Sequence, residues 1–409
     1  MLTFMRSLWY NKRGNALFIA AGALPLLIGS AGIAVDTVQW AVWKRQLQRA
    51  ADSAAIAGAY AKKGGQNVSA AVTLDLGKNN YVGFATTSTV NNPPTTGSYT
   101  ADANAVNVAL VITKQLSFSS VFTSTPTTIK ASATATNISG DYCVVSLEPG
   151  TATGLSAGGS TTLNLGCGMH TNSSGPSAAV EFGAATVVAS PIAAVGGITG
   201  SWTGTLIPND SAMADPFAGV SPPTLPSPCN TALTLNNGSA NYTGGGCYTS
   251  MNIKGTATFG PGVYYINGGD ITMNGNGAII ATQGTTFVLT NSSAAANATI
   301  GGVKMNGNGD FSVVAPDTGW SKGIAIYQDR RATAGNSVTW NGTAASKIQG
   351  ALYFPKANVT FTGNQNMDVK CMQLVGQDIT FTGNSNVTNV CPLNSASGSF
   401  KSSRMRLVE

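Results

Sequence analysis

One stretch of this 409-residue chain constrains its fold more than any other. Residues 16–35, ALFIAAGALPLLIGSAGIAV, contain no charged side chain. A helix rises about 1.5 Å per residue, so twenty residues cross the roughly 30 Å hydrocarbon core of a bilayer. Gly and Pro within the run are tolerated in membrane spans. The stretch therefore predicts a single transmembrane helix.

A cleaved secretory signal is the alternative, with Arg6, Lys12 and Arg13 as its basic region and a small-residue site at residues 21–23. However, the apolar run is longer than usual for a signal, and it continues into a segment with helical spacing, residues 36–63. One long helix is the simpler interpretation. The predicted organisation is a basic cytoplasmic segment, residues 1–15, followed by the span and its extension, residues 16–61.

Composition limits the architecture of the chain beyond this helix. Charged residues make up 9 % of the chain, and 49 positions are Gly. That profile is typical of many short strands joined by tight turns and does not suit a helical enzyme. The net charge of +6 is carried by the two ends of the chain, since residues 64–400 hold 11 basic and 13 acidic residues. The main domain therefore lacks the excess of positive charge that nucleic-acid binding requires.

Six cysteines lie beyond the apolar run: Cys143, Cys167, Cys229, Cys247, Cys371 and Cys391. Without a Cys-x-x-Cys motif, and with His170 as the one histidine, a zinc site is not indicated. An even number of cysteines beyond a membrane span indicates disulfides in an oxidising compartment. We therefore expect the bulk of the chain in the periplasm or outside the cell. The sequence predicts no metal and no cofactor.

Three short motifs flank and follow the apolar run. They are RGN at residues 13–15, GIAVD at residues 32–36, and the Ala-rich LQRAADSAAIAGA at residues 47–59. In this order and spacing, the segment resembles the amino-terminal domain of the TadG-like proteins of the Flp (tight adherence) pilus system. That resemblance implies a single-pass protein of the bacterial inner membrane that assembles or anchors a pilus, with other pilus-assembly proteins as partners.

A processed pilin is a related possibility. Prepilin families are cut after a Gly and carry a Glu at the fifth residue beyond the cut. If Gly14 were that site, the fifth residue would be Ile19. This departure predicts that the chain stays in the membrane.

Residues 62–141 alternate a possible helix with strand-like pieces, of which residues 104–114 show clear two-residue alternation. This pattern predicts a small α+β domain next to the membrane. An irregular stalk is the alternative.

Residues 142–397 contain an internal repeat. Five stretches share a β-branched residue, a Met or aromatic two positions on, and a closing Gly. They are residues 271–275, 303–307, 338–342, 359–363 and 379–383. The last two intervals, 21 and 20 residues, are near one coil of a parallel, right-handed β-helix, in which equivalent residues stack about 4.8 Å apart. An antiparallel β-sandwich is the alternative. Residues 219–228, GVSPPTLPSP, are expected to be a surface insertion or a joint between two runs of coils, and residues 398–409 a short tail.

Cysteine spacing agrees with coils of this length. Cys371 and Cys391 are 20 residues apart, which would place them one above the other. Cys143 and Cys167 are 24 apart and are expected to pair in the same way. Cys229 and Cys247 would then close the loop after the Pro-rich stretch.

Parallel β-helices also occur in polysaccharide-processing enzymes, which need paired carboxylates or a calcium cluster. The candidates are Asp310, Asp317, Asp329, Arg330 and Arg331. Asp310 closes an Asn-Gly turn, and Asp329 is expected to form a solvated ion pair with the arginines, so neither predicts catalysis. His170 near Cys167 is likewise expected to be incidental to a disulfide.

The sequence thus predicts no catalytic residues and a non-enzymatic, membrane-anchored component of Flp pilus assembly or surface attachment. Its repetitive β domain would contact proteins, or a cell-envelope or surface polymer. The alternatives are a β-helix polysaccharide-processing enzyme and a secreted adhesin with a cleaved signal.

Overall fold

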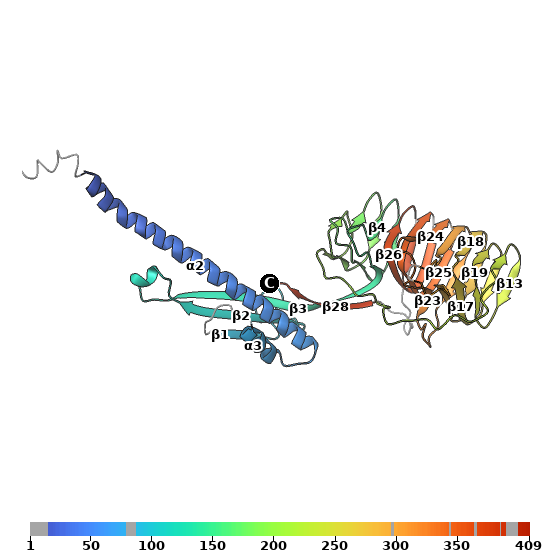
Figure 1. Ribbon diagram of the computed structural model, residues 1–409, viewed down its shortest axis with the longest axis horizontal. Coiled ribbons are helices and arrows are strands. Elements are labelled where there is room, and N and C mark those ends of the chain that lie inside the picture. The colour runs from blue at the N-terminus through green and yellow to red at the C-terminus, as the bar shows by residue number, and fades with distance from the viewer. Residues whose placement is uncertain are drawn as a thin grey trace, which may run out of the picture. The chain divides into compact units, whose positions relative to one another are not determined.

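The computed structural model describes residues 15–78, 87–295, 298–342, 345–363, 366–384, 386–389 and 400–409. The chain divides into two compact units. Unit 1 comprises Met1–Ile138 with Ser403–Glu409, and unit 2 comprises Ser139–Ser402. Each has its own buried apolar core. Figure 1 labels part of the elements used below.

Unit 1 is built from two helices and an antiparallel sheet in which β2 pairs with both β1 and β3. Its elements are α2 (Asn15–Lys63), α3 (Val68–Lys78), β1 (Thr87–Asn91), β2 (Ala105–Lys114), the short 3-10 helix η1 (Ser119–Val121), the first part of β3 (Thr127–Ser146) and the end of β28 (Phe400–Leu407). The last residues pair with β3, because Thr134 N–H donates to the Glu409 carbonyl at 2.7 Å and Val408 N–H to the Thr134 carbonyl at 2.9 Å. Of the stretch expected as a short tail, Ser403–Glu409 is thus part of unit 1.

The core of unit 1 lies between α2 and the sheet. Most alanines of the second half of α2 are buried, among them Ala51 and Ala54, which share one apolar cluster with Val106 and Val108 of β2. Small residues at these positions let the helix lie close to the sheet. Gly58 shows how close, because a Cβ placed there would lie 2.9 Å from the Val106 side chain. The Ala-rich motif is therefore explained by packing.

Unit 2 is formed from short parallel strands. Their bounds are β4 (Leu155–Ala157), β5 (Thr162–Asn164), β6 (Gly168–Thr171), β7 (Ala179–Glu181), β8 (Thr186–Val188), β9 (Ile192–Ala194), β10 (Ile198–Thr199), β11 (Leu206–Ile207), β12 (Leu233–Leu235), β13 (Ser239–Tyr242), β14 (Gly246–Tyr248), β15 (Met251–Ile253), β16 (Thr256–Phe259), β17 (Gly262–Asn267), β18 (Ile271–Gly275), β19 (Ala278–Ala281), β20 (Thr285–Thr290), β21 (Val303–Gly307), β22 (Phe311–Val314), β23 (Ile324–Gln328), β24 (Asn336–Gly342), β25 (Ala345–Gly363), β26 (Asn366–Phe381) and β27 (Asn386–Asn389). The end of β3 also belongs to this unit.

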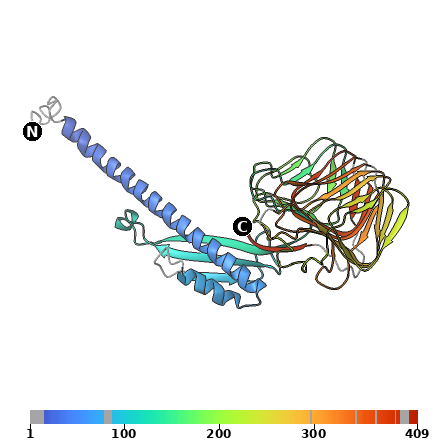
Figure 2. The ribbon, with the colours of Figure 1, turned by 45° about the vertical axis from the view of Figure 1, so that its right-hand side comes forward.

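These strands form three ladders, because most strands pair with the strand three elements further along the chain. Figure 2 shows the strands of unit 2 stacked beside one another. The first ladder runs β12–β15–β18–β21–β24–β25–β26–β4–β7–β10. The second runs β13–β16–β19–β22–β25–β26–β27–β5–β8. The third runs β14–β17–β20–β23–β25–β26–β3–β6–β9–β11. Every described pairing between strands of unit 2 is parallel, so an antiparallel sandwich does not describe it.

The five repeated stretches of the sequence are neighbours in the first ladder. Ile271 pairs with Val303, and Val359 pairs with both Val338 and Ile379. Two positions on, the aromatic rings stack. The ring centroids of Trp340 and Phe361 are 5.0 Å apart, and those of Phe361 and Phe381 are 5.1 Å apart. The repeat is therefore a stack of equivalent buried positions.

The order of strands within the ladders differs from their order in the sequence. The chain enters unit 2 at β3, in the middle of the stack, and builds outward to β10 and β11. It then resumes at the opposite end with β12 and returns until β26 and β27 pair with β3, β4 and β5. We call this junction between β26–β27 and β3–β5 the seam. Both runs of coils progress in one direction along the stack.

Stacked glycines at the corners predict a sharp packing effect. A Cβ on Gly309 would lie 1.5 Å from the Gly277 carbonyl oxygen of the neighbouring coil, so Gly309→Ala forces the two backbones apart. We expect a loss of unfolding free energy of about 1–3 kcal/mol, the usual cost of overpacking. Urea unfolding of the full chain in detergent, followed by β-sheet circular dichroism, measures it. Gly219→Ala is the control, because no atom lies within 4 Å of its added Cβ; equal midpoints for both variants would contradict the stacking argument.

Candidate functional site

Helix α2 has two parts with opposite surroundings. Among the described residues, Ile19–Lys63 is the helix long and apolar enough to cross a membrane. Its first part exposes large apolar side chains, including Leu26 at 75 % and Ile33 at 64 % exposure. From Leu47 onward its inner face is buried in the core of unit 1. The exposed apolar half of α2 therefore requires an apolar medium outside unit 1. The second half of the helix fixes this apolar half to unit 1.

Asp36, at the end of the GIAVD motif, holds the β2–β3 hairpin against α2. Its carboxylate accepts hydrogen bonds from the backbone N–H groups of Phe118 at 2.8 Å and Ser119 at 2.7 Å, and from the Ser119 hydroxyl. Bonds to an ionised acceptor are stronger than neutral ones. Gly32, one turn earlier, leaves room for the Phe118 ring, which a Cβ would meet at 2.3 Å. Two residues of the motif thus have a specific packing role.

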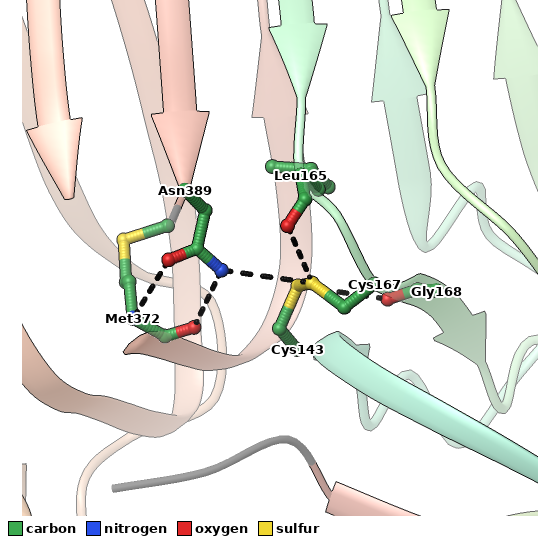
Figure 3. Close-up of a disulfide and its surroundings, with 6 residues drawn as sticks. All are labelled: Cys143, Leu165, Cys167, Gly168, Met372 and Asn389. Atoms are coloured by element: carbon green, nitrogen blue, oxygen red, sulfur yellow. Dashed lines mark hydrogen bonds between the residues drawn. A yellow bond between two sulfur atoms is a disulfide. The ribbon is translucent and has the colours of Figure 1, made fainter. Parts of the chain in front are cut away.

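The first disulfide joins Cys143 of β3 to Cys167, which directly precedes β6 (Figure 3). Their α-carbons are 5.8 Å apart. Asn389 of β27 lies beside it, with its side-chain nitrogen 3.6 Å from the Cys167 sulfur. The Asn389 side-chain oxygen accepts the Met372 N–H at 3.0 Å. The bridge therefore lies at the seam, where the last coils of the chain contact the first.

The second disulfide joins Cys229 to Cys247 of β14, with α-carbons 5.0 Å apart. It fastens the end of the Pro-rich stretch to the outermost coil at one end of the stack. Both bridges match the pairs that the spacing predicts. Cys391 lies outside the described residues, so its pairing with Cys371 stays a prediction.

The residues between β11 and β12, 208–232, form a strap along the third ladder. His170 Nε2 lies 3.2 Å from the Ser211 carbonyl, and Asn172 donates to the Met213 carbonyl at 2.8 Å. Further along, the Tyr327 hydroxyl donates to the Val220 carbonyl at 3.2 Å. The strap is the joint between the two runs of coils.

Arg330 is the main fastening point of the strap. Its guanidinium pairs with Asp215 at 3.2 Å and donates to the carbonyls of Phe217 and Val220. The Tyr353 hydroxyl donates to the same Asp215 carboxylate at 2.6 Å. Burial, reinforced by the Asp215 carboxylate, raises the pKa of Tyr353, so this hydroxyl keeps its proton. Arg330, expected in a solvated loop pair, instead binds a distant segment.

The family model described as "putative Flp pilus-assembly TadE/G-like" matches residues 14–61. This segment is a Tad domain. The match covers the exposed half of α2, Asp36 and the buried alanines, and it agrees with the resemblance of the three motifs. A Tad domain with one candidate membrane-spanning helix indicates a membrane-anchored protein involved in Flp pilus assembly. No curated protein and no solved structure matches the chain.

Outside the Tad domain, the carboxylates considered above as a possible enzyme site are not brought together in one site. Asp310 is exposed and precedes β22 of the second ladder, whereas Asp329 follows β23 of the third. Asp329 pairs with Arg331 at 2.7 Å and accepts the Thr290 hydroxyl at 2.8 Å. Desolvation opposes ionisation of Asp329, but hydrogen bonds, chiefly from Arg331, outweigh it and lower its pKa. Asp317 lies in the loop between β22 and β23 and is exposed.

His170 has a structural environment as well. It is buried, lies 3.8 Å from Asp210, and packs edge to face on Tyr142 with ring centroids 5.5 Å apart. Cys167 is in a disulfide, so it offers no thiol nucleophile beside this histidine. Among the described residues, no group of three or more His, Cys, Asp or Glu side chains could hold a metal ion.

A pair of carboxyl groups at the seam was not foreseen from the sequence. Glu148 and Asp378 are 230 positions apart, and no motif connects them. The Asp378 side chain hydrogen-bonds Glu148, which also accepts the Gly150 N–H at 2.9 Å and the Gln377 amide at 3.1 Å. Burial, together with the hydrogen bond and charge of Glu148, raises the pKa of Asp378 to about 7. Asp378 therefore keeps its proton to a higher pH than an ordinary carboxyl group, at the point where the two runs of coils join.

The disulfides give a direct prediction. Peptide mapping without reduction should recover Cys143 linked to Cys167 and Cys229 linked to Cys247, with Cys371 linked to Cys391 as the third pair. Each bridge should stabilise unit 2 by about 3 kcal/mol, because it closes a loop of roughly 20 residues. Pairs of Cys→Ser substitutions measured by urea unfolding test the magnitude. Free thiols at Cys143 and Cys167 would contradict both the bridge and the oxidising compartment.

The seam carboxyl pair predicts a pH dependence. The pKa of Asp378 is about 7 in the folded protein and near 3.8 in the unfolded chain, so the unfolded chain releases this proton first as pH rises. Its contribution to stability is complete below about pH 4 and is lost as pH rises to about 7. Asp378→Asn should flatten the fall in Tm of unit 2 across this range. Asp310→Asn, at an exposed position, is the control; an unchanged slope in Asp378→Asn would contradict the raised pKa of Asp378.

Proposed function

We propose that this protein is a non-enzymatic component of Flp pilus assembly or surface attachment, anchored in the bacterial inner membrane. The observation that carries the proposal is the continuity of α2. Its exposed apolar half is the length of a membrane span, and its other half is packed into the core of unit 1 within the same Tad domain. A folded ectodomain is therefore fixed to the anchor by one unbroken helix.

Unit 2, in this proposal, is a right-handed parallel β-helix. The three parallel ladders, the stacked aromatic rings and the close glycine corners support it. Right-handed crossovers are strongly preferred between parallel strands. Such a stack presents a long, rigid surface of repeated positions. Its partners would be other pilus-assembly proteins, or a cell-envelope or surface polymer.

The ectodomain lies in the periplasm or is exposed outside the cytoplasm. The two disulfides support this side of the membrane, because such bridges persist in oxidising compartments. A non-enzymatic role is supported by the contacts of the polar residues. Asp215, Arg330 and Tyr353 fasten the strap, and Asp329 is bound by Arg331.

Complementation of a strain lacking the gene tests the proposal. One variant replaces residues 16–31 by an unrelated apolar sequence of equal length, which keeps Gly32 and Asp36 and their contacts with the hairpin. The other expresses residues 36–409 behind a cleavable secretory signal, which keeps the buried part of α2 that unit 1 needs. We expect the deletion to impair pilus formation and surface attachment, the replaced span to restore them, and the soluble form not to restore them.

Membrane fractionation and mass spectrometry of the mature N-terminus accompany this test. The uncleaved chain should fractionate with membranes. A soluble product that begins near Leu24 or Val35 would contradict the anchor. Full restoration by the soluble form would favour a secreted adhesin.

A further inference from the structure

The turn of the β2–β3 hairpin carries no charge and exposes two large apolar side chains. Residues 115–129, between Lys114 and Lys130, contain no Asp, Glu, Lys or Arg. Within this turn, which includes η1, Val121 and Phe122 are each 75 % exposed. We call residues 117–122 the tip. Two large adjacent apolar side chains in this position are costly in water and indicate a covered surface.

The tip is held against α2 at a defined position along the helix. Asp36 accepts the N–H groups of Phe118 and Ser119, and the Gln39 side-chain oxygen accepts the Ser117 N–H at 3.1 Å and hydroxyl at 3.0 Å. Phe118 packs over Gly32 and edge to face on Phe122, with ring centroids 5.2 Å apart. The tip therefore cannot leave the helix without breaking these bonds.

The Gly32 contact lies within the apolar run, and the Asp36 and Gln39 contacts directly follow it. Gly32 precedes Val35, the last residue of the run, by three positions, which corresponds to roughly 5 Å along a helix. At the same level, Ile33 is 64 % and Val35 is 56 % exposed. An apolar medium that covers these side chains also reaches the tip, because the tip contacts the helix at Gly32 and Asp36, on either side of them.

We propose that the tip inserts into the surface of the bilayer that α2 spans, on the side of the folded units, with Val121 and Phe122 in contact with lipid. The inference rests on the membrane anchoring proposed above. It gives the protein a second membrane contact beside the span. The apolar faces of segments that bind at a membrane surface are buried about 5–10 Å into the boundary between headgroups and acyl chains.

The insertion also explains an acidic residue at the end of a membrane span. A carboxylate at this depth is costly unless its oxygens are bound. The tip supplies two backbone N–H groups and one hydroxyl to Asp36, which is 5 % exposed. Asp36 thus fixes the hairpin, and the hairpin in turn shields Asp36 from the hydrocarbon.

The groups just beyond the tip suit the headgroup region. A hollow of about 570 Å³ between α2 and the hairpin is lined by Gln39, Trp43, Lys114 and their neighbours. The Lys114 ammonium lies 5.4 Å from the Trp43 ring centroid. Tryptophan and lysine are the side chains that favour the interface between membrane and water. Along α2, the side chains therefore change from apolar to those that favour the membrane interface, as expected for a helix that leaves a bilayer.

Nitroxide labels on the full chain in proteoliposomes test the insertion. Single labels are placed through Val121→Cys and Phe122→Cys, under non-reducing conditions that leave the native disulfides intact. Two reference labels are Leu26→Cys in the apolar half of α2 and Leu74→Cys on α3, whose side chain is 62 % exposed. Collisions with oxygen, which enters lipid, and with a water-soluble nickel chelate are compared by power saturation.

We expect the labels at 121 and 122 to resemble the label at 26, with nickel accessibility several-fold below that at 74. Asp36→Asn combined with the label at 121 should raise both nitroxide mobility and nickel accessibility, because the tip loses its charged acceptor. Asp52→Asn, further along α2, should change neither.

The outcomes separate this inference from the anchoring on which it rests. Nickel accessibility at 121 and 122 equal to that at 74, with lipid contact at 26, would overturn tip insertion and leave the anchor standing. Water contact at 26 as well would contradict the anchor itself. Protection of the tip that disappears when the protein is diluted in lipid would identify a second copy of the chain as its cover, and would also overturn the proposal.

Discussion

The fold of unit 2 depends on the hydrogen bonds across the seam. Without the seam, both runs of coils would end in an open edge of unpaired N–H and C=O groups. The Leu147 N–H donates to the Gly376 carbonyl and the Ile379 N–H to the Gly154 carbonyl, each at 2.8 Å. The first disulfide and the Glu148–Asp378 pair lie at the same junction. Strong stabilising contacts are thus concentrated where the chain closes a loop of more than 200 residues.

The length and course of the strap follow from this order of strands. Because β11 and β12 lie at opposite ends of the stack, the intervening residues must cross about nine strand spacings of the third ladder, or roughly 43 Å. The 25 residues 208–232 can span about 80 Å when extended, so they cross with length to spare. Prolines suit such a segment, since it follows the surface without joining a ladder. Arg330 and the second disulfide hold it in place.

The sequence predicted those parts of the structure whose signal is local or periodic. The apolar run and the Ala-rich motif predicted α2, and the repeat starting at Ile271 predicted strands that are indeed neighbours. The seam has no such signal, because Val144 pairs with Leu374 across 230 positions and the early coils lack the aromatic repeat. Asp36 was visible in its motif, but its partners are on a hairpin more than 80 residues away. The uncharged run between Lys114 and Lys130 was the available clue to the tip.

The position of the seam also determines how the stack can vary. The chain enters unit 2 at β3 in mid-stack, and Phe400, close to the exit, packs on Phe217 of the strap with ring centroids 5.5 Å apart. The chain therefore passes from unit 1 into unit 2 at the middle of the stack and not at either end. One end is closed by Trp202, which is 7 % exposed and donates to the Thr199 carbonyl, and the other by Tyr242 stacked on Phe259. Because each coil pairs with the adjacent coils and otherwise contacts the strap, coils can be gained or lost near either end, with a matching change in strap length, while the seam and the anchored helix keep their contacts.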